Sequence, residues 1–285
     1  MNSSNLNRLL NRTVIVLCLV TLSACGGGST GGTSAKTGYF IDSAVEGLQY
    51  KSGTLSGVTG ANGSFQYEEN QPVSFSIGKL ELGSVNVINN RVFPVDLISG
   101  ARDETHPQVS LLAQILQTLD SDGDPSNGIT ITEATRNAIA QTISITTADP
   151  TQASAALTQL LGRATQGRST NLINATAAKG HLQANLLKEY AGNWSGTFSG
   201  GDQGNCQVVI SDLGAISGTC ASTNNGGGTF NLGGTVSSSG DSTATSGSAS
   251  TGATFTGTYT RGGQVTGQWT NSQFNLNGTW TLSKR

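Results

Sequence analysis

The sequence predicts a multidomain, mainly β protein with a helical middle. We expect a small β-sandwich at residues 38–102, a short helix cluster at 103–190 and a C-terminal eight-stranded antiparallel up-and-down β-barrel at 191–285. Three observations predict this organisation. Apolar and polar residues alternate in the first segment, apolar residues recur at helical spacing in the second, and evenly spaced alternating runs fill the third.

Residues 1–24 have the composition of a secretory signal. Arg8 and Arg12 precede an apolar run from Thr13 to Leu22, and no acidic residue occurs in this part of the chain. The run of about ten residues is too short for a transmembrane helix, which needs roughly 20. A basic start, a short apolar run and small residues before a cleavage site together predict a signal peptide.

The end of this run, Leu22-Ser23-Ala24-Cys25, resembles the lipobox of bacterial lipoproteins. The resemblance implies that Cys25 becomes the lipidated first residue, carrying palmitate or a related acyl chain. Gly26 in the next position favours the cell outer membrane in that family, without specifying its periplasmic or outer face. The alternative is an ordinary cleaved signal and plain secretion. Residues 25–37 would then form a flexible Gly/Ser-rich tether on a stable lipid anchor.

The charge balance limits the classes of partner. Removal of residues 1–24 leaves 13 basic and 17 acidic residues, a net charge of −4. This weak acidity argues against nucleic acid, which requires basic patches. Only 11% of the residues are charged, which is typical of an exported β-rich surface protein and not of a disordered polyelectrolyte.

Residues 38–102 contain short strands with turns between them. Val73 to Ile77 alternates apolar and polar residues, as half-buried antiparallel strands do. Gly60-Ala61-Asn62-Gly63 predicts a turn, because Asn and Gly tolerate positive φ. The longer string Thr59-Gly60-Ala61-Asn62-Gly63-Ser64-Phe65 resembles the core of carboxypeptidase-regulatory-like (transthyretin-like) modules of bacterial surface proteins. That resemblance implies a structural spacer.

Residues 103–190 predict four short helices. The first begins near Pro107, the second follows Thr132 as its cap and reaches about Thr142, the third starts at Asp149, and the fourth spans 175–190. The first carries an apolar face at helical spacing, formed by Val109, Leu111, Leu112, Ile115, Leu116 and Leu119. Helices of this length depend on packing against their neighbours.

Three aspartates follow the first helix at alternate positions: Asp120, Asp122 and Asp124. They resemble the first, third and fifth positions of an EF-hand loop, which implies a Ca²⁺ site built from hard oxygen ligands. The later positions depart from that pattern, since the sixth is not glycine and Glu133 lies two residues beyond the usual bidentate acid. The alternative is a polar turn in which Asp and Asn accept backbone hydrogen bonds. No other cofactor is expected.

The chain lacks the sequence signatures of catalysis, and we expect a protein that is not an enzyme. It has no nucleophile elbow between a strand and a helix and no phosphate-binding glycine loop. His106 and His181 are its only histidines, without metal-ligand spacing, and surface or capping roles are expected for them. Glu68 and Glu69 are adjacent, so a strand would point them to opposite faces.

Residues 191–285 contain only Asp202, Asp212, Asp241, Arg261, Lys284 and Arg285 as charged residues. Eight strands are expected near 193–199, 205–211, 215–221, 228–237, 241–249, 252–261, 264–271 and 274–283. The alternation predicts an inner face of aromatic, aliphatic and glycine residues, the glycines leaving room for the rings: Trp194, Gly196, Phe198, Phe230, Leu232, Gly234, Val236, Phe255, Gly257, Tyr259, Val265, Gly267, Trp269, Phe274, Leu276, Gly278, Trp280 and Leu282.

Two cysteines fix the register of one hairpin in this segment. Cys206 and Cys220 are symmetric about Leu213, so they lie directly opposite each other if the hairpin turns there. Val208 then faces Gly218, and Ile210 faces Ile216. Export favours oxidation, so a disulfide between Cys206 and Cys220 is predicted.

The first and last strands, 192–198 and 278–280, resemble those of avidin- and lipocalin-like barrels in architecture, with no ligand residue matched. The interior of an eight-stranded barrel is nearly filled by side chains or holds one small ligand. We therefore expect a non-enzymatic surface lipoprotein of the outer membrane that acts in binding, adhesion or assembly with an unknown protein or glycan partner. The alternative is a carrier whose barrel binds a small apolar molecule or glycan.

Overall fold

The computed structural model describes residues 34–285 apart from 147–148, 225–227 and 247–251. Cys25 and the predicted signal peptide lie outside the described residues. The described chain is mainly β with four α-helices, as predicted. Its buried apolar residues form two cores, one running from Phe40 to Leu186 and the other from Tyr190 to Leu282. The predicted sandwich and helical segments share the first core, and the barrel has the second.

Two sheets form the β part of the first core. The three-stranded sheet has the order β5 (Ser64–Glu68), β1 (Ala35–Phe40), β8 (Arg91–Val92). The five-stranded sheet has the order β10 (Ile143–Ser144), β7 (Leu80–Val85), β6 (Val73–Ile77), β3 (Gln49–Ser52), β4 (Leu55–Val58). A small pair joins β2 (Val45–Glu46) to β9 (Ile129–Thr130).

The sheets face each other through aromatic rings. The rings of Phe40 on β1 and Phe65 on β5 lie 4.9 and 5.0 Å from the ring of Phe75 on β6. The sandwich is not purely antiparallel, because β1 pairs with β8 and β7 pairs with β10 in parallel. The edge strand β10 belongs to the predicted helical segment at 103–190. The alternation pattern of residues 38–102 therefore does not predict it.

The predicted turn at Gly60 to Gly63 is present. The Gly63 amide donates to the Gly60 carbonyl oxygen at 2.7 Å, and Gly63 has φ +76°. A Cβ at this position would lie 2.4 Å from the carbonyl oxygen of Phe40, so only glycine fits. The buried Thr59 hydroxyl donates to Val45 and accepts the Leu48 amide. Thr59, Gly60 and Gly63 of this motif therefore have structural roles.

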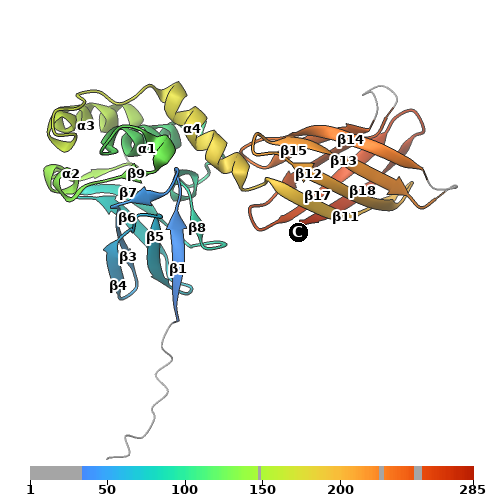
Figure 1. Ribbon diagram of the computed structural model, residues 1–285, viewed down its shortest axis with the longest axis horizontal. Coiled ribbons are helices and arrows are strands. Elements are labelled where there is room, and N and C mark those ends of the chain that lie inside the picture. Colours follow the sequence, from blue (N-terminus) through green and yellow to red (C-terminus); the bar gives the residue numbers. More distant parts are fainter. Residues whose placement is uncertain (1–33, 147–148, 225–227, 247–251) are drawn as a thin grey trace, which may run out of the picture. The chain divides into compact units, whose positions relative to one another are not determined.

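Four helices cover the sheets: α1 (Pro107–Leu119), α2 (Glu133–Ala138), α3 (Pro150–Ala164) and α4 (Ala175–Lys188). Helix α1 packs against α3 and α4, and Figure 1 shows these helices on one side of the strands. Thr132 and Asp149 cap their helices as expected. Helix α2 ends earlier than predicted because Ile143–Ser144 pairs with β7 instead. No helix within the described residues is long and apolar enough to cross a membrane.

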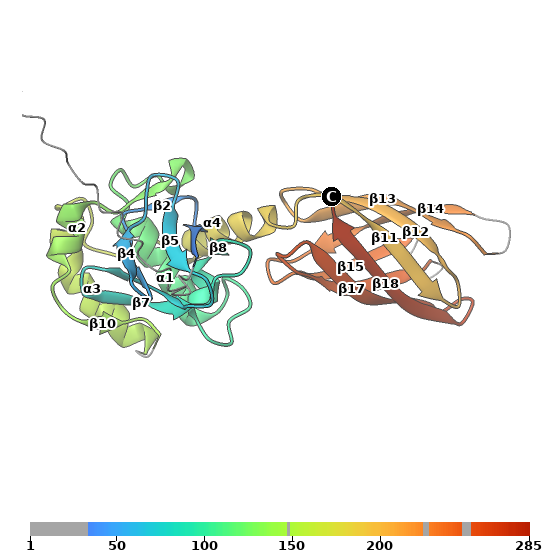
Figure 2. The ribbon, with the colours of Figure 1, turned by 90° about the horizontal axis from the view of Figure 1, so that it is seen from below.

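The C-terminal segment forms the predicted closed, eight-stranded up-and-down barrel (Figures 1 and 2), in which every neighbouring pair is antiparallel and β18 closes onto β11. Its strands are β11 (Gly192–Gly200), β12 (Gly204–Ile210), β13 (Ala215–Ser222), β14 (Thr229–Val236), β15 (Asp241–Ser246), β16 (Thr254–Tyr259), β17 (Gln264–Asn271) and β18 (Leu276–Lys284).

One inner-face prediction is wrong. Phe274 is 64% exposed, because β18 begins only at Leu276. The Phe274 amide donates to Asn271 Oδ1 at 3.2 Å, and Asn275 adopts φ +49°. These residues therefore form a turn instead of extending the strand, and the turn leaves the Phe274 ring exposed.

Candidate functional site: the open mouth of the barrel

The middle of the barrel is filled by a tryptophan that lies over glycines. The Trp280 indole donates to the carbonyl oxygens of Thr256 and Gln268 at 3.0 and 3.2 Å. A Cβ on Gly267 would lie 2.5 Å from Trp280 Nε1, and one on Gly257 would lie 2.8 Å from its Cζ2. The predicted alternation of glycines and rings on the inner face thus packs this level of the barrel.

Aromatic side chains also close one end of the barrel. The rings of Trp194 and Tyr259 are 4.7 Å apart and perpendicular, and Trp194 Nε1 donates to the Tyr190 carbonyl oxygen at 2.8 Å. The Tyr190 hydroxyl donates to the Ser238 carbonyl oxygen at 3.3 Å. Burial raises the pKa of Tyr259 above its usual range, so this phenol stays neutral.

At the opposite end of the barrel, the described residues line a cavity of about 390 Å³. Five aromatic residues line it, and four of them lie close together: the rings of Phe198, Phe230, Phe255 and Trp269 have neighbouring centroids 5.9 to 6.3 Å apart. The remaining lining residues belong to strand ends and turns around the opening: Asp202, Ser246, Gly252, Ala253, Asn271, Phe274 and Leu276. We call this the mouth site.

The mouth site combines apolar rings with polar groups near its edge. The Asp202 carboxylate accepts hydrogen bonds from its neighbour's amide and from the Ser222 hydroxyl, and Asn271 Oδ1 accepts the Phe274 amide. Small-molecule sites are concave and mostly apolar, with a few polar groups that fix orientation. The geometry therefore suits a small ring-shaped ligand that offers one apolar face and polar edges.

The predicted disulfide lies beside this site. Cys206 and Cys220 are bonded, with Cα atoms 4.0 Å apart, and the pairs Val208–Gly218 and Ile210–Ile216 have the expected register. Cys220 also pairs with Phe230, whose ring lines the mouth site. The bond thus joins β12 to β13, and these strands pair with β11 and β14, which carry the rings of Phe198 and Phe230.

The three candidate calcium ligands Asp120, Asp122 and Asp124 differ in their hydrogen-bond partners. Asp120 is buried, and its Oδ1 accepts the Thr130 amide at 2.9 Å. Asp122 accepts the Asp124 amide, while Asp124 accepts both the amide and the hydroxyl of Ser126 and caps a short 3-10 turn. Three or more His, Cys, Asp or Glu side chains do not converge as a metal-binding group anywhere in the described residues.

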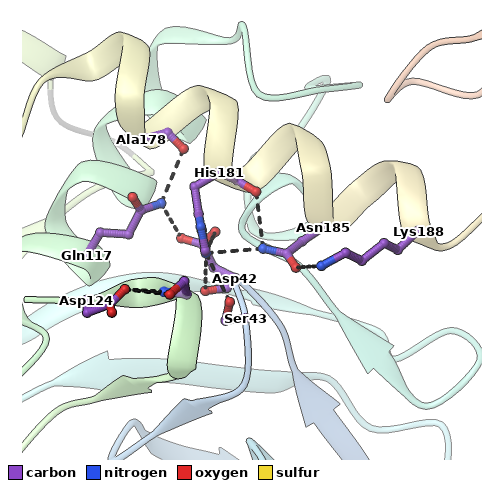
Figure 3. A network of polar contacts seen from close by, with 9 residues as sticks. Asp42, Ser43, Gln117, Asp124, Ala178, His181, Asn185 and Lys188 are labelled. Atoms are coloured by element: carbon purple, nitrogen blue, oxygen red, sulfur yellow. Dashed lines mark hydrogen bonds and ion pairs between the residues drawn. The ribbon is translucent and has the colours of Figure 1, made fainter. Parts of the chain in front are cut away.

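A buried polar network missed by the sequence reasoning lies between α1 and α4 (Figure 3). Asp42 is fully buried; its Oδ2 accepts Gln117 Nε2 at 3.0 Å, and its Oδ1 lies 3.9 Å from His181 Nε2. The same histidine nitrogen is 3.0 Å from the Ser43 hydroxyl and 3.2 Å from Asn185 Nδ2. No local sequence motif predicts this network, because its residues are far apart in the sequence.

Burial dominates the electrostatics of the network. It raises the pKa of Asp42 to about 7, against the opposing hydrogen bond from Gln117, and it lowers the pKa of His181. A serine hydroxyl beside a histidine nitrogen is one part of a catalytic triad. Here Asp42 approaches the nitrogen that also faces Ser43, whereas a triad carboxylate holds the other ring nitrogen. The geometry is that of a buried structural network.

The other polar residues singled out from the sequence are also placed. His106 occupies the N-cap position of α1, but its side chain makes no cap hydrogen bond. Glu68 is buried and its carboxylate accepts the Thr54 amide, whereas Glu69 is exposed and pairs with Lys36 at 2.5 Å. The two glutamates thus point apart as expected.

No protein-family model matches this chain, and no curated protein is significantly similar to it.

Proposed function

We propose that this protein is a non-enzymatic surface lipoprotein and that the mouth site of its barrel binds the terminal ring of a glycan. The observation that carries the proposal is the cavity lined by five aromatic residues, one of which, Phe274, is 64% exposed. A large exposed aromatic side chain beside a concave apolar site is typical of a binding surface.

A sugar ring matches the chemistry of this cavity. Its C–H face is apolar and can lie against Phe274 and Trp269, while its hydroxyl groups can bond to the polar groups of Asp202 and Asn271. The volume of about 390 Å³ lies in the lower part of the range of small-molecule sites. Adhesion to a glycan-coated surface or assembly with a glycosylated partner would use this contact.

The alternative, a carrier with its cargo deep inside the barrel, is less well supported. Such a carrier needs a hollow interior, whereas the centre here contains Trp194, Phe255, Tyr259 and Trp280, each at most 5% exposed. Rings packed on glycines fill the centre of the barrel, whereas the mouth site has a cavity of about 390 Å³ that can hold a ligand.

The proposal also places the protein at the outer membrane, through a lipid on Cys25. The lipobox-like residues before Cys25 and the tether at 25–37 support a lipid anchor in the outer membrane. A binding protein held at a membrane by a lipid anchor can contact a surface without any catalytic step.

A glycan array tests the proposed activity. The full mature protein, purified with its lipid in detergent, is applied to immobilised bacterial and host oligosaccharides. We expect binding to a subset that shares one terminal sugar. An array on which the folded protein binds no glycan would contradict the proposal.

A further inference from the structure

The mouth site is lined by aromatic rings and a single carboxylate. Of the described residues around the cavity, Asp202 alone is charged, and five carry aromatic rings. The face of an aromatic ring is the negative side of its quadrupole, so it attracts a cation as well as apolar groups. The rings and the carboxylate therefore both favour a ligand that carries a positive charge.

The charged residues of the barrel are divided between its two ends. Asp202 lies in the turn between β11 and β12, which is at the mouth. The others lie in turns or at strand ends of the closed end: Asp212, Asp241, Arg261, Lys284 and Arg285. Among the described barrel residues, the mouth thus carries one negative charge and no positive charge. Such an asymmetry raises the local concentration of cationic ligands.

One oxygen of the Asp202 carboxylate is available to a ligand. Its Oδ1 accepts the Gln203 amide at 2.7 Å and the Ser222 hydroxyl at 2.8 Å, and these two bonds hold the carboxylate in place. Its Oδ2 accepts no hydrogen bond from the described residues, and the side chain is half-buried. A hydrogen bond from an ammonium group to a carboxylate is roughly twice as strong as one between neutral groups.

The rings of the mouth site lie in two orientations. The ring of Phe255 makes an angle of 26° with that of Trp269 and of 29° with that of Phe230. The ring of Phe198 is nearly perpendicular to those of Phe255 and Trp269, at 89° and 87°. The Trp269 N–H already donates to the Ser199 carbonyl oxygen, so this side chain offers its ring to a ligand and not its donor.

We propose that the mouth site selects a glycan whose terminal ring carries an ammonium group, that is, an amino sugar without an acetyl group on its nitrogen. The C–H face of the sugar lies against the rings, and the ammonium group donates to Asp202 Oδ2. An acidic sugar would bring a second negative charge to this carboxylate and is disfavoured. This inference rests on the proposed glycan binding and names the chemistry of the ligand.

Calorimetric titration of the full mature protein in detergent tests this selection with the methyl glycosides of glucosamine and galactosamine. Each is compared with its N-acetylated form and with the corresponding neutral hexose. We expect at least one amine glycoside to bind about tenfold or more tightly than its N-acetylated form, because acetylation removes the charged donor. Choline, which has an ammonium group and no sugar ring, should bind more weakly than this glycoside.

The variant Asp202→Asn isolates the contribution of the charge. Its amide oxygen can still accept the Gln203 amide and the Ser222 hydroxyl, so the turn keeps its shape. Affinity for the amine glycoside should fall about tenfold or more, and affinity for the neutral hexose should not change. Asp212→Asn removes an exposed carboxylate from a turn at the closed end and is the matched control, with unchanged affinity for every sugar.

The outcomes separate this inference from the proposed function. A neutral or N-acetylated sugar that binds as tightly as the amine, or an amine affinity that Asp202→Asn leaves intact, would overturn the selection of amino sugars while glycan binding stands. Choline that binds more tightly than every amino sugar would also overturn it. A folded protein that binds none of these sugars and no glycan of the array would contradict both.

Discussion

Gly278 lies directly against the indole of Trp269: a Cβ on the glycine would come within 2.6 Å of Trp269 Nε1. The two residues pair across β17 and β18, and the indole donates to the Ser199 carbonyl oxygen at 3.0 Å. The glycine on β18 thus leaves the space that the Trp269 ring of the mouth site occupies on β17.

Gly278→Ala should therefore destabilise the barrel. The added methyl group would also lie 1.8 Å from the Ser199 carbonyl oxygen, so the backbone must move. We expect a loss of about 1 to 3 kcal/mol in the free energy of unfolding, measured with urea. Gly233→Ala is the matched control, because a Cβ there meets only one atom, at 3.9 Å, and this variant should be near neutral. Equal stability of the two variants would contradict this view of the inner face.

The disulfide should contribute measurably to barrel stability. Cys206 and Cys220 are 14 positions apart, and closing a 15-residue loop is worth about 3 kcal/mol in the chain-entropy model. The double variant Cys206→Ala/Cys220→Ala should unfold at lower urea concentration than the oxidised wild type. A reductant should lower the wild-type transition and leave the variant unchanged. A wild type that does not respond to reductant would refute the contribution.

Asp42 should make the stability of the first core depend on pH. Its pKa is about 7 in the folded state and about 3.9 in an unfolded chain, so the folded state binds more protons between these values. The contribution of Asp42 to the free energy of unfolding should fall as pH rises from about 4 to 7, by on the order of 4 kcal/mol. Urea unfolding at several pH values measures this slope.

Asp42→Asn tests that slope. The variant should match the wild type near pH 4 and exceed it at pH 8, because the amide never carries a charge. His181 acts with the opposite sign: its lowered pKa removes stability as pH falls through about 6.5, in both proteins. A difference between variant and wild type that stays constant with pH would rule out the role of Asp42.

Cys25→Ala should release the protein from the membrane fraction, because the acyl chains of the predicted anchor are attached to this residue. Metabolic labelling with a palmitate analogue and fractionation measure both effects. The wild type should be labelled and membrane-bound, and the variant neither. Continued membrane association of an unlabelled variant would refute the anchor.

The barrel was predictable because its pattern is local and repeated. Alternation predicted the strands and most of the inner face, and the symmetric cysteines predicted the register of the hairpin formed by β12 and β13. Phe274 departs from this pattern because a left-handed Asn275 ends the run, and a tight turn of this kind has no apolar periodicity.

The long-range contacts were not predictable. In the network of Asp42, Gln117 and His181, side chains from the packed helices α1 and α4 both approach Asp42. Tertiary packing alone brings residues 42 and 181 together. The parallel pairing of β10 with β7 likewise shortens α2, since neither segment carries a strong preference by itself. The alternate spacing of its aspartates predicted the acidic loop. Only the structure shows that Asp120 is buried whereas Asp124 is exposed and caps a short 3-10 turn.

Affinity of matched variants for the glycan selected on the array tests the proposed binding function most directly. Phe274→Ala removes the exposed ring of the mouth site, and Leu213→Ala removes an 80% exposed apolar side chain from a turn at the closed end of the barrel. Loss of an aromatic anchor typically costs more than 1.4 kcal/mol, so Phe274→Ala should weaken binding about tenfold or more. Leu213→Ala should bind as the wild type does. Equal affinity of both variants would contradict binding at the mouth of the barrel.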